Sequence, residues 1–240
     1  MAEMALREAY GRALAEYGET NLKVVVLDAD TSSSTLASYF AKRFPERFFN
    51  VGIAEMNMAA MAAGLATTGK IPFINTFACF MVLRCGDPIR SLIAYSGLNV
   101  KIAGAYAGIS DSYDGASHHS ILDVAFMRAL PNMTVLCPAD GIECAKMVDA
   151  LERHRGPAYV RVNRNDLPFV TPPEEPYHRL SARPLSPCPR SRTPSPKPPK
   201  LRDCCDRSLP RSWMTRAAST PGSLAKMASG PTGSGPATTA

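Results

Sequence analysis

The sequence predicts an α/β fold over residues 1–177: a doubly wound, mostly parallel six-stranded sheet with helices on both faces. Two observations lead to this prediction. Short apolar runs without polar alternation, such as KVVVLD at residues 23–28, are typical of strands buried on both faces. Helical patterns separate these runs, and strands that alternate with helices form parallel sheets. Ligands of such sheets bind in loops beyond the carboxyl ends of the strands.

The elements follow in order along the chain. Helical spacing of Leu6, Tyr10 and Leu14 predicts a helix over residues 4–17, and the apolar run at 23–28 predicts a strand. Ser and Thr residues that can cap a helix precede a predicted helix at 32–43. The same patterns predict a strand at 48–51, a helix from Glu55 to Thr68, a strand at 71–75, a helix at 78–95, a strand at 100–104, a helix at 122–130, a strand at 133–137, a helix at 141–154 and a strand at 158–162.

The basic character of the chain belongs to residues 178–240. The whole chain of 240 residues has a formal charge of +6. Residues 178–240 hold 11 Lys and Arg against 2 Asp, which gives +9 and leaves −3 for residues 1–177 (16 Lys and Arg against 19 Asp and Glu). This segment also has 11 of the 21 Pro and no Val, Ile, Phe or Tyr, so we expect it to be disordered. Nothing in the mildly acidic body indicates a nucleic-acid partner.

Cysteines and hydropathy indicate the compartment. No run of 18 or more apolar residues suggests a membrane span, and the N-terminus lacks a signal-peptide pattern. Cys79, Cys85, Cys137 and Cys144 lack CxxC spacing, so we interpret them as core thiols. A cytoplasmic protein without a membrane partner is therefore expected.

Glu55 is an unusual carboxylate. It opens a segment of Ala, Met, Leu and Gly that has no other charge until Lys70. An acidic group suits a helix N-terminus, but a helix that is apolar nearly all round should be buried. A carboxylate in that place needs a partner, or it takes up a proton. A helix-start role and a functional role both stay open from the residues alone.

Residues 50–69 (NVGIAEMNMAAMAAGLATTG) resemble the pyrimidine-binding domain of transketolases. The resemblance covers about residues 4–172 and continues, in the family's order and spacing, through PFINTFACF (72–80), DGASH (114–118), RALPN (128–132) and PAD (138–140). It implies a thiamine diphosphate-binding fold and the transfer of a two-carbon ketol unit between sugars or sugar phosphates. A deoxyxylulose-phosphate synthase or a 2-oxo-acid dehydrogenase β-type chain is the alternative within enzymes, and the NMAAMAAGLA and DGxSH patterns favour transketolase.

The resemblance implies a set of cofactor contacts. Glu55 would be the catalytic carboxyl group that contacts the aminopyrimidine ring of thiamine diphosphate. Phe80, with Phe77, would form an apolar slot for that ring, although plain core packing is the other interpretation of both. Asp30 and Ile53 would also lie near the cofactor. Leu83 departs from the family, since many transketolases have a third aromatic residue there.

The resemblance also implies substrate contacts. Asp114 and His118 would contact substrate hydroxyls, with His118 also catalytic; a metal site that uses His119 is the less favoured interpretation. Ser34, Arg164 and Arg7 would lie near a substrate phosphate, which a guanidinium binds through two donors. The alternative for a lone Arg is a solvated surface charge. Tyr106 stands where many members have a phosphate-contacting His.

The sequence lacks the other half of such a site. A GDG-type loop followed by an Asn about thirty residues on would bind the diphosphate and its Mg²⁺ or Ca²⁺, and the nearest motif, Gly86-Asp87-Pro88, lies in a helical pattern. We therefore expect a hetero-oligomer with a diphosphate-binding transketolase N-terminal subunit, and no transfer by this chain alone.

The segment after Tyr177 does not match the family, which continues into a third α/β domain. We interpret the abrupt change as a reading-frame shift that replaces this domain. A genuine Pro-rich linker or interaction tail is the alternative. A truncated, non-catalytic fragment is accordingly the rival to the enzyme.

Overall fold

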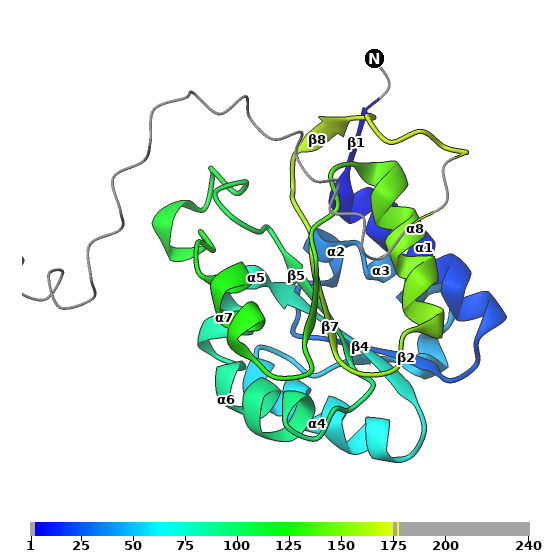
Figure 1. Ribbon diagram of the computed structural model, residues 1–240, viewed down its shortest axis with the longest axis vertical. Coiled ribbons are helices and arrows are strands. Elements are labelled where there is room, and N and C mark those ends of the chain that lie inside the picture. The colour runs from blue at the N-terminus through cyan, green and yellow to red at the C-terminus, as the bar shows by residue number, and fades with distance from the viewer. Residues whose placement is uncertain (1–2, 175–176, 178–240) are drawn as a thin grey trace, which may run out of the picture. The chain divides into compact units, whose positions relative to one another are not determined.

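The structure, a computed structural model, describes residues 3–174 and 177. Its centre is a six-stranded sheet with the order β3-β2-β4-β5-β7-β6, in which every pair of neighbours is parallel (Figure 1). The strands are Val24–Asp28 (β2), Phe48–Asn50 (β3), Ile71–Phe77 (β4), Lys101–Ala105 (β5), Thr134–Leu136 (β6) and Ala158–Arg161 (β7). The predicted doubly wound α/β fold is confirmed. The predicted tail, residues 178–240, lies outside the described residues.

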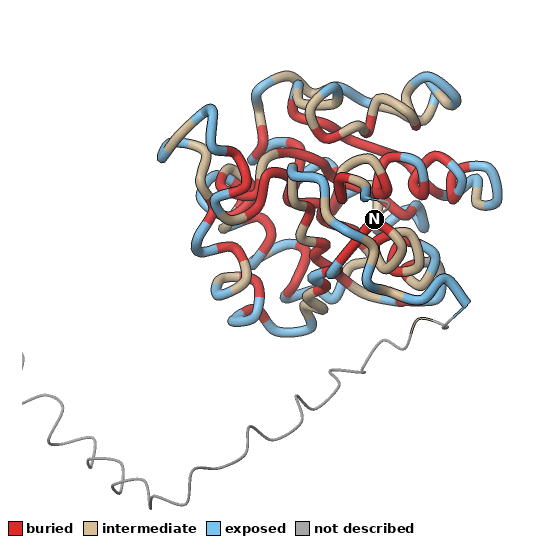
Figure 2. The backbone as a smooth tube through the Cα atoms, turned by 90° about the horizontal axis from the view of Figure 1, so that it is seen from above, coloured by how far each residue is buried: buried red, intermediate tan, exposed pale blue. Residues whose placement is uncertain are grey.

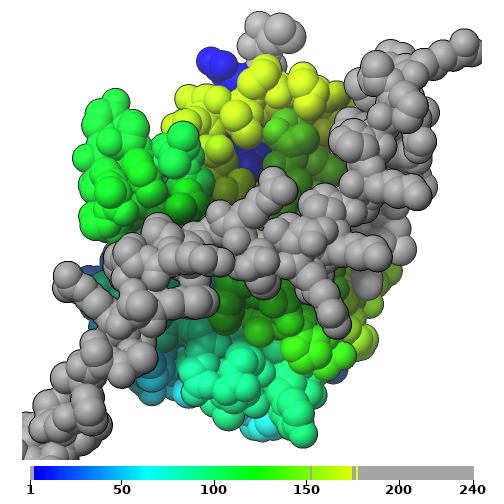
Figure 3. Space-filling view, turned by 60° about the vertical axis from the view of Figure 1, so that its left-hand side comes forward, coloured from blue at the N-terminus to red at the C-terminus, as the bar shows by residue number. Residues whose placement is uncertain are grey.

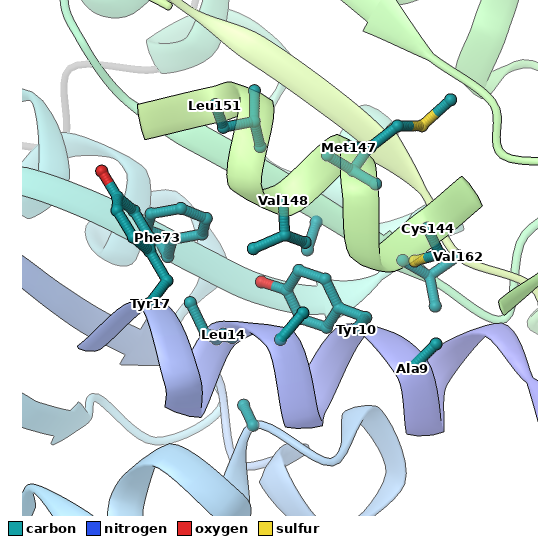
Figure 4. Packing of buried hydrophobic residues seen from close by; sticks show 14 of the residues in the cluster. Ala9, Tyr10, Leu14, Tyr17, Phe73, Cys144, Met147, Val148, Leu151 and Val162 are labelled. Atoms are coloured by element: carbon teal, nitrogen blue, oxygen red, sulfur yellow. The ribbon is translucent and has the colours of Figure 1, made fainter. Parts of the chain in front are cut away.

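Three helices pack on one face of the sheet: α1 (Leu6–Thr20), α3 (Ser38–Arg43) and α8 (Gly141–Arg153). Tyr10, Leu14 and Tyr17 of α1 point toward α8 and β4, where Val148 and Phe73 meet them (Figure 4). The hydroxyl of Tyr10 donates to Asn75 Oδ1 on β4 at 2.7 Å, so this buried polar group has a partner. α8 begins at the predicted place, because Asp140 Oδ1 accepts a hydrogen bond from the backbone N–H of Glu143 at 2.9 Å.

The opposite face is covered by α4 (Glu55–Thr67), α5 (Ala78–Leu83), α7 (Asp123–Ala129) and a π-helical turn, η2 (Ile89–Ala94). Met58, Met81 and Ile93 are fully buried between these helices and the sheet. Figure 2 shows the buried residues running through the strands and the inner faces of the helices, with exposed residues at the loops. Short helical turns connect these elements: α2 (Ser32–Thr35), η1 (Pro45–Arg47), α6 (Gly86–Pro88) and η3 (Gly115–Ser117).

Three predicted helices differ from the structure. The helix predicted at 32–43 is divided, because Leu36 adopts a left-handed conformation (φ 60°) that no α-helix continues through. The helix predicted at 78–95 is divided into α5, α6 and η2. The first helix begins at Leu6 rather than Met4, because Glu3–Ala5 (β1) pairs antiparallel with Asp166–Pro168 (β8). Figure 3 shows this contact between the first (blue) and last (yellow) described residues.

Two burial predictions are wrong. The sequence predicts that α4, which is apolar nearly all round, is buried; its first residue, Glu55, and the face with Met58 and Ala62 are covered, but Met56 is 58% exposed on the other face. Cys137 is exposed, unlike the other three described cysteines, because it follows the last residue of β6 at the sheet's edge. Within residues 3–174 and 177, no helix has the length and apolar character needed to cross a membrane.

Asp28 ends β2 and organises the loop that follows. Its carboxylate is fully buried and accepts hydrogen bonds from the backbone N–H of Thr31 at 2.6 Å and from the hydroxyl of Thr35 at 3.4 Å. Burial raises the pKa of Asp28 from 3.8 to about 6, against the opposing effect of these hydrogen bonds. The carboxylate is therefore ionised at neutral pH at a cost in folding stability.

We expect Asp28→Asn to be more stable than the parent near pH 7, by about 1–3 kcal/mol. The folded chain binds the Asp28 proton more tightly than the unfolded chain does. The contribution of this proton to the free energy of unfolding is therefore complete below about pH 4 and is lost as pH rises through about 6. An amide does not titrate, so the advantage of the variant should shrink as pH falls toward 4. Urea unfolding of both proteins at several pH values measures this. A constant difference, or a less stable variant at pH 7, would contradict the assignment.

Candidate functional site

Side chains from four loops meet at the carboxyl edge of the sheet. Glu55 opens α4 shortly after β3, Phe77 ends β4, Tyr106 follows β5, and Arg164 follows β7. Because the six strands are parallel, all their carboxyl ends lie at the same edge, and these loops converge there. Of the residues that the sequence places at strand-to-helix transitions, Glu55 lies at the one between β3 and α4, Phe77 at the one between β4 and α5, His118 at the one between β5 and α7, and Asp140 at the one between β6 and α8.

Glu55 is 4% exposed at the N-terminus of α4. Arg84, the residue that caps the end of α5, donates a hydrogen bond from Nη1 to Glu55 Oε1 in an ion pair. The thiol of Cys85 donates to the backbone carbonyl oxygen of Glu55 at 3.1 Å. The predicted need for a partner at this carboxylate is thus met by a cation that is not among the predicted site residues.

An aromatic cluster lies beside this carboxylate. The rings of Phe77 and Tyr106 are stacked, with centroids 4.6 Å apart and an interplanar angle of 22°. Phe80 lies 5.9 Å from Phe77, and His118 meets the rings of Phe77 and Phe80 edge-on at 5.5 and 5.2 Å. Phe77 and Phe80 are half-buried, and neither belongs to the two buried clusters that flank the sheet. Plain core packing is therefore the weaker interpretation of both.

Arg84 joins the carboxylate to the aromatic cluster. Its guanidinium carbon lies 3.9 Å from the centroid of the Phe80 ring, while its Nη1 holds Glu55. The structure therefore brings together four of the predicted site residues, namely Glu55, Phe80, Phe77 and His118. It adds Arg84 as the contact between the first two of these residues.

Two guanidinium groups lie around Tyr106. Arg7 Nη1 donates to the Tyr106 hydroxyl at 3.1 Å and to the backbone oxygen of Ser34 at 3.2 Å. The guanidinium carbon of Arg164 lies 4.8 Å from the Tyr106 ring centroid, and Arg164 pairs with the buried carboxylate of Asp111. Of the predicted phosphate contacts, Arg7 and Arg164 are thus connected through Tyr106, and Ser34 is connected to them through Arg7. Two such cations at one place can bind an anion.

The loop between β5 and α7 carries the DGxSH motif and stands out from the body of the fold (Figure 1). His118 is half-buried, with Nδ1 2.9 Å from the hydroxyl of Ser117. Asp114 is exposed, and the neighbouring Asp111 carboxyl raises its pKa. His119 Nε2 lies 3.0 Å from the backbone oxygen of Asp111. In the described part of the chain no group of three His, Cys, Asp or Glu residues could hold a metal ion.

Two predicted cofactor residues lie outside this network. Asp30 is exposed, adopts a left-handed conformation (φ 61°) and accepts a hydrogen bond from Asn50 Nδ2 at 2.9 Å. Ile53 is 75% exposed. Asp30 follows β2 and Ile53 precedes α4, so both lie at the carboxyl edge, but the aromatic cluster does not include them.

Arg84 and Asp111 are site residues that the sequence did not reveal. A signal for Arg84 was present, since it is the first charged residue after Lys70 in an apolar stretch. Asp111 had no such signal, because the loop contains two Asp residues and only tertiary packing decides which of them is buried. Tyr106 was noted as a departure from the family, but its ring stack with Phe77 could not be inferred.

Comparison with known proteins identifies the family. The family model described as "Transketolase, pyrimidine binding domain" matches residues 2–170. A Methanocaldococcus jannaschii protein described as a transketolase C-terminal section is 49% identical over 170 residues, which are 71% of this chain and 54% of that protein. The 6-deoxy-6-sulfo-D-fructose transketolase subunit of a Clostridium species is 39% identical over 68% of this chain and 51% of its own length. The chain thus spans about half the length of these relatives.

A solved structure described as a split gene transketolase, an inactive beta4 tetramer, matches with a TM-score of 0.66 and 50% identity. The match covers 74% of this chain and 57% of that one. Both the sequence and the fold of the described residues lead to the same assignment. The chain belongs to the transketolase family, and its residues 2–170 form the pyrimidine-binding domain of that family.

Proposed function

We propose that this chain is the pyrimidine-binding subunit of a thiamine diphosphate-dependent transketolase-like enzyme that transfers a two-carbon ketol unit between sugars. The observation that carries the proposal is the buried Glu55 carboxylate next to the half-buried Phe80 ring, at the ligand-binding edge of the sheet. The family membership and the names of the relatives support it.

The side chains of the candidate site suit an aminopyrimidine ring. Phe80 and Phe77 offer flat apolar surfaces for stacking, and the Glu55 carboxyl group can hydrogen-bond a ring nitrogen. When bound, the cofactor supplies the nucleophilic carbon that accepts the ketol unit. Glu55 would hold the proton at the ring nitrogen, and the aromatic slot would orient the ring and exclude water. Asp30 and Ile53 would contribute from the rim of the same edge.

The substrate would lie toward Tyr106 and His118. Arg7 and Arg164, with Ser34 nearby, would bind the anionic end of the sugar, because guanidinium groups donate to such oxygens in pairs. The Clostridium relative is named for a sulfonated sugar, so a phosphate and a sulfonate are both anions that this arrangement can serve. His118 and Asp114 would contact hydroxyls near the reacting carbons, with His118 placed against the cofactor's aromatic slot.

A partner subunit would complete the site. A surface groove at Glu55 is lined by Met56, Leu83 and Arg84, and the Leu83 side chain is 71% exposed there. Exposed apolar side chains around a groove are typical of interaction surfaces. We propose that a diphosphate-binding subunit, which holds Mg²⁺ or Ca²⁺, covers this groove in a cytoplasmic hetero-oligomer. The 50%-identical solved protein, described as an inactive beta4 tetramer of a split gene transketolase, supports this requirement.

We propose that the pyrimidine-binding domain comprises residues 1–177; the family match over residues 2–170 supports most of this range. We also propose that a reading-frame shift has replaced the third domain of the family with residues 178–240. The rival proposal is a chain that keeps the pyrimidine-binding domain but is not catalytic, because the third domain is lost.

The first test mixes the full chain with the diphosphate-binding subunit of a split transketolase. We expect ketol transfer from the mixture, with thiamine diphosphate and Mg²⁺ present, and none from either protein alone, because each holds half of the cofactor site. Size-exclusion chromatography of the mixture reports association independently of activity. No association would favour the non-catalytic fragment, and association without transfer would contradict the proposed activity.

Glu55→Gln should reduce turnover of the assembled enzyme by about 10²–10⁴-fold, as the loss of a positioned acid–base group does. The amide is the same size as the carboxyl group, so the fold and cofactor affinity should be retained. Glu46→Gln is a matched control, because Glu46 is exposed and pairs with Arg47 away from the site. Turnover of Glu55→Gln equal to that of the control would remove Glu55 from the mechanism.

Phe80→Ala should weaken thiamine diphosphate binding by about 1–3 kcal/mol, the usual contribution of stacking between an aromatic side chain and a heterocyclic base. Phe80→Tyr keeps the ring and should bind the cofactor nearly as well as the parent. Equilibrium titration of the assembled enzyme measures the affinity, and thermal unfolding measures the stability of each variant. If stability falls while affinity is unchanged, Phe80 has only a packing role.

A further inference from the structure

Arg84 occupies the place where the two principal contacts of the proposed pyrimidine site meet. One of its guanidinium nitrogens holds the Glu55 carboxylate, and the guanidinium carbon lies 3.9 Å from the centroid of the Phe80 ring. The other neighbours of this ring, Phe77 and His118, meet it at steep angles of 56° and 65°. In the chain without a partner subunit, the planar group that lies over the Phe80 ring is thus the guanidinium group of Arg84.

A guanidinium group resembles an aminopyrimidine in the features that this site recognises. Both are planar, both stack on an aromatic face, and both present N–H donors to a carboxylate. A ring that hydrogen-bonds Glu55 and stacks on Phe80 would need the position that the guanidinium group now has. The two cannot occupy it together.

The environment of Arg84 allows it to leave. Its side chain is 46% exposed, whereas the Glu55 side chain is 5% exposed. Glu55 is the fixed member of the pair, on the first turn of α4, and Arg84 is the member with access to solvent. Arg84 also lines the groove with Met56 and Leu83, so a subunit that covers those apolar side chains reaches Arg84 directly.

We propose that Arg84 blocks the pyrimidine site of the unpartnered chain and must leave Glu55 and Phe80 before the cofactor binds. This inference rests on the proposed function. In the lone chain Arg84 compensates the charge of a buried carboxylate, which would otherwise be costly. On assembly the partner and the cofactor replace it, so cofactor loading depends on the presence of the second subunit.

The size of the effect follows from a two-state equilibrium. If Arg84 covers the site in about nine of ten molecules, the apparent affinity for a pyrimidine is about tenfold weaker than that of the open site. Removal of the guanidinium group should therefore tighten binding by about tenfold. A residue that merely forms a surface ion pair would give no change.

The test uses the full chain alone, with 4-amino-5-hydroxymethyl-2-methylpyrimidine as the probe and nuclear magnetic resonance titration as the readout. Arg84→Ala should bind the probe about tenfold more tightly than the parent. Arg90→Ala is the matched control, since Arg90 forms an exposed ion pair with Asp87, one helical turn earlier in the sequence. The control should bind the probe like the parent.

Arg84→Gln gives a second measurement if loss of the whole side chain prevents folding. The shorter amide retains a donor for Glu55 but has no planar cation to place over the Phe80 ring. The Arg84→Gln variant should therefore also bind the probe more tightly than the parent. Thermal unfolding confirms that each variant is folded. Equal binding by folded Arg84 variants would overturn the blocking role and leave Arg84 as an ion-pair partner only; weaker binding would overturn it and make Arg84 part of the binding surface.

A parallel titration separates this outcome from failure of the proposed function. The parent chain assembled with a diphosphate-binding subunit should bind thiamine diphosphate in the presence of Mg²⁺. If it does, and the Arg84 variants show no gain with the probe, only the blocking role is wrong. If the assembled parent binds no cofactor, the proposed function fails and the inference fails with it.

Discussion

Parallel pairing of β2, β4 and β5 is the constraint on which the rest of the structure depends. Asp28 of β2 lies in register with Asn75 of β4, and Phe77 of β4 lies in register with Ala105 of β5. This register places the residues that follow each strand at one level. Because the helices occupy both faces, the carboxyl edge is the part of the sheet where polar and aromatic side chains can converge without disturbing the core.

The buried carboxylates of this domain are stabilised in different ways. Glu55, Asp111 and Asp123 each pair with an Arg from a neighbouring segment, which compensates the charge. Asp28 has mainly Thr31 and Thr35 as donors, and its burial raises the pKa. Burial acts the same way on Asp140, but backbone N–H groups of Glu143, Val170 and Thr171 outweigh it and lower the pKa. Of these ion pairs, the one at Glu55 has a half-exposed guanidinium group, that of Arg84, beside a groove. A ligand in the groove can therefore reach the pair and displace the guanidinium group.

The same exposed region connects assembly with chemistry. α4 buries Met58 against the sheet and exposes Met56, while its first residue is the carboxylate at the centre of the proposed site. A subunit that covers the exposed face of α4 therefore also changes the surroundings of Glu55, because the two features share one turn of helix. Low water access at this carboxylate would strengthen every polar contact made there.

The sequence by itself determined the fold class and the positions of the six strands, and its resemblance to transketolases supplied the candidate residues Glu55, Phe80, His118 and Arg164. Periodicity and apolar runs are local properties of the chain, so they are visible without the fold. Only the tertiary structure decided the break at Leu36, the exposed face of α4, the stack of Tyr106 on Phe77 and the pairing of Arg84 with Glu55. The last two of these join segments that are distant in sequence, so tertiary packing sets them rather than the preference of any residue.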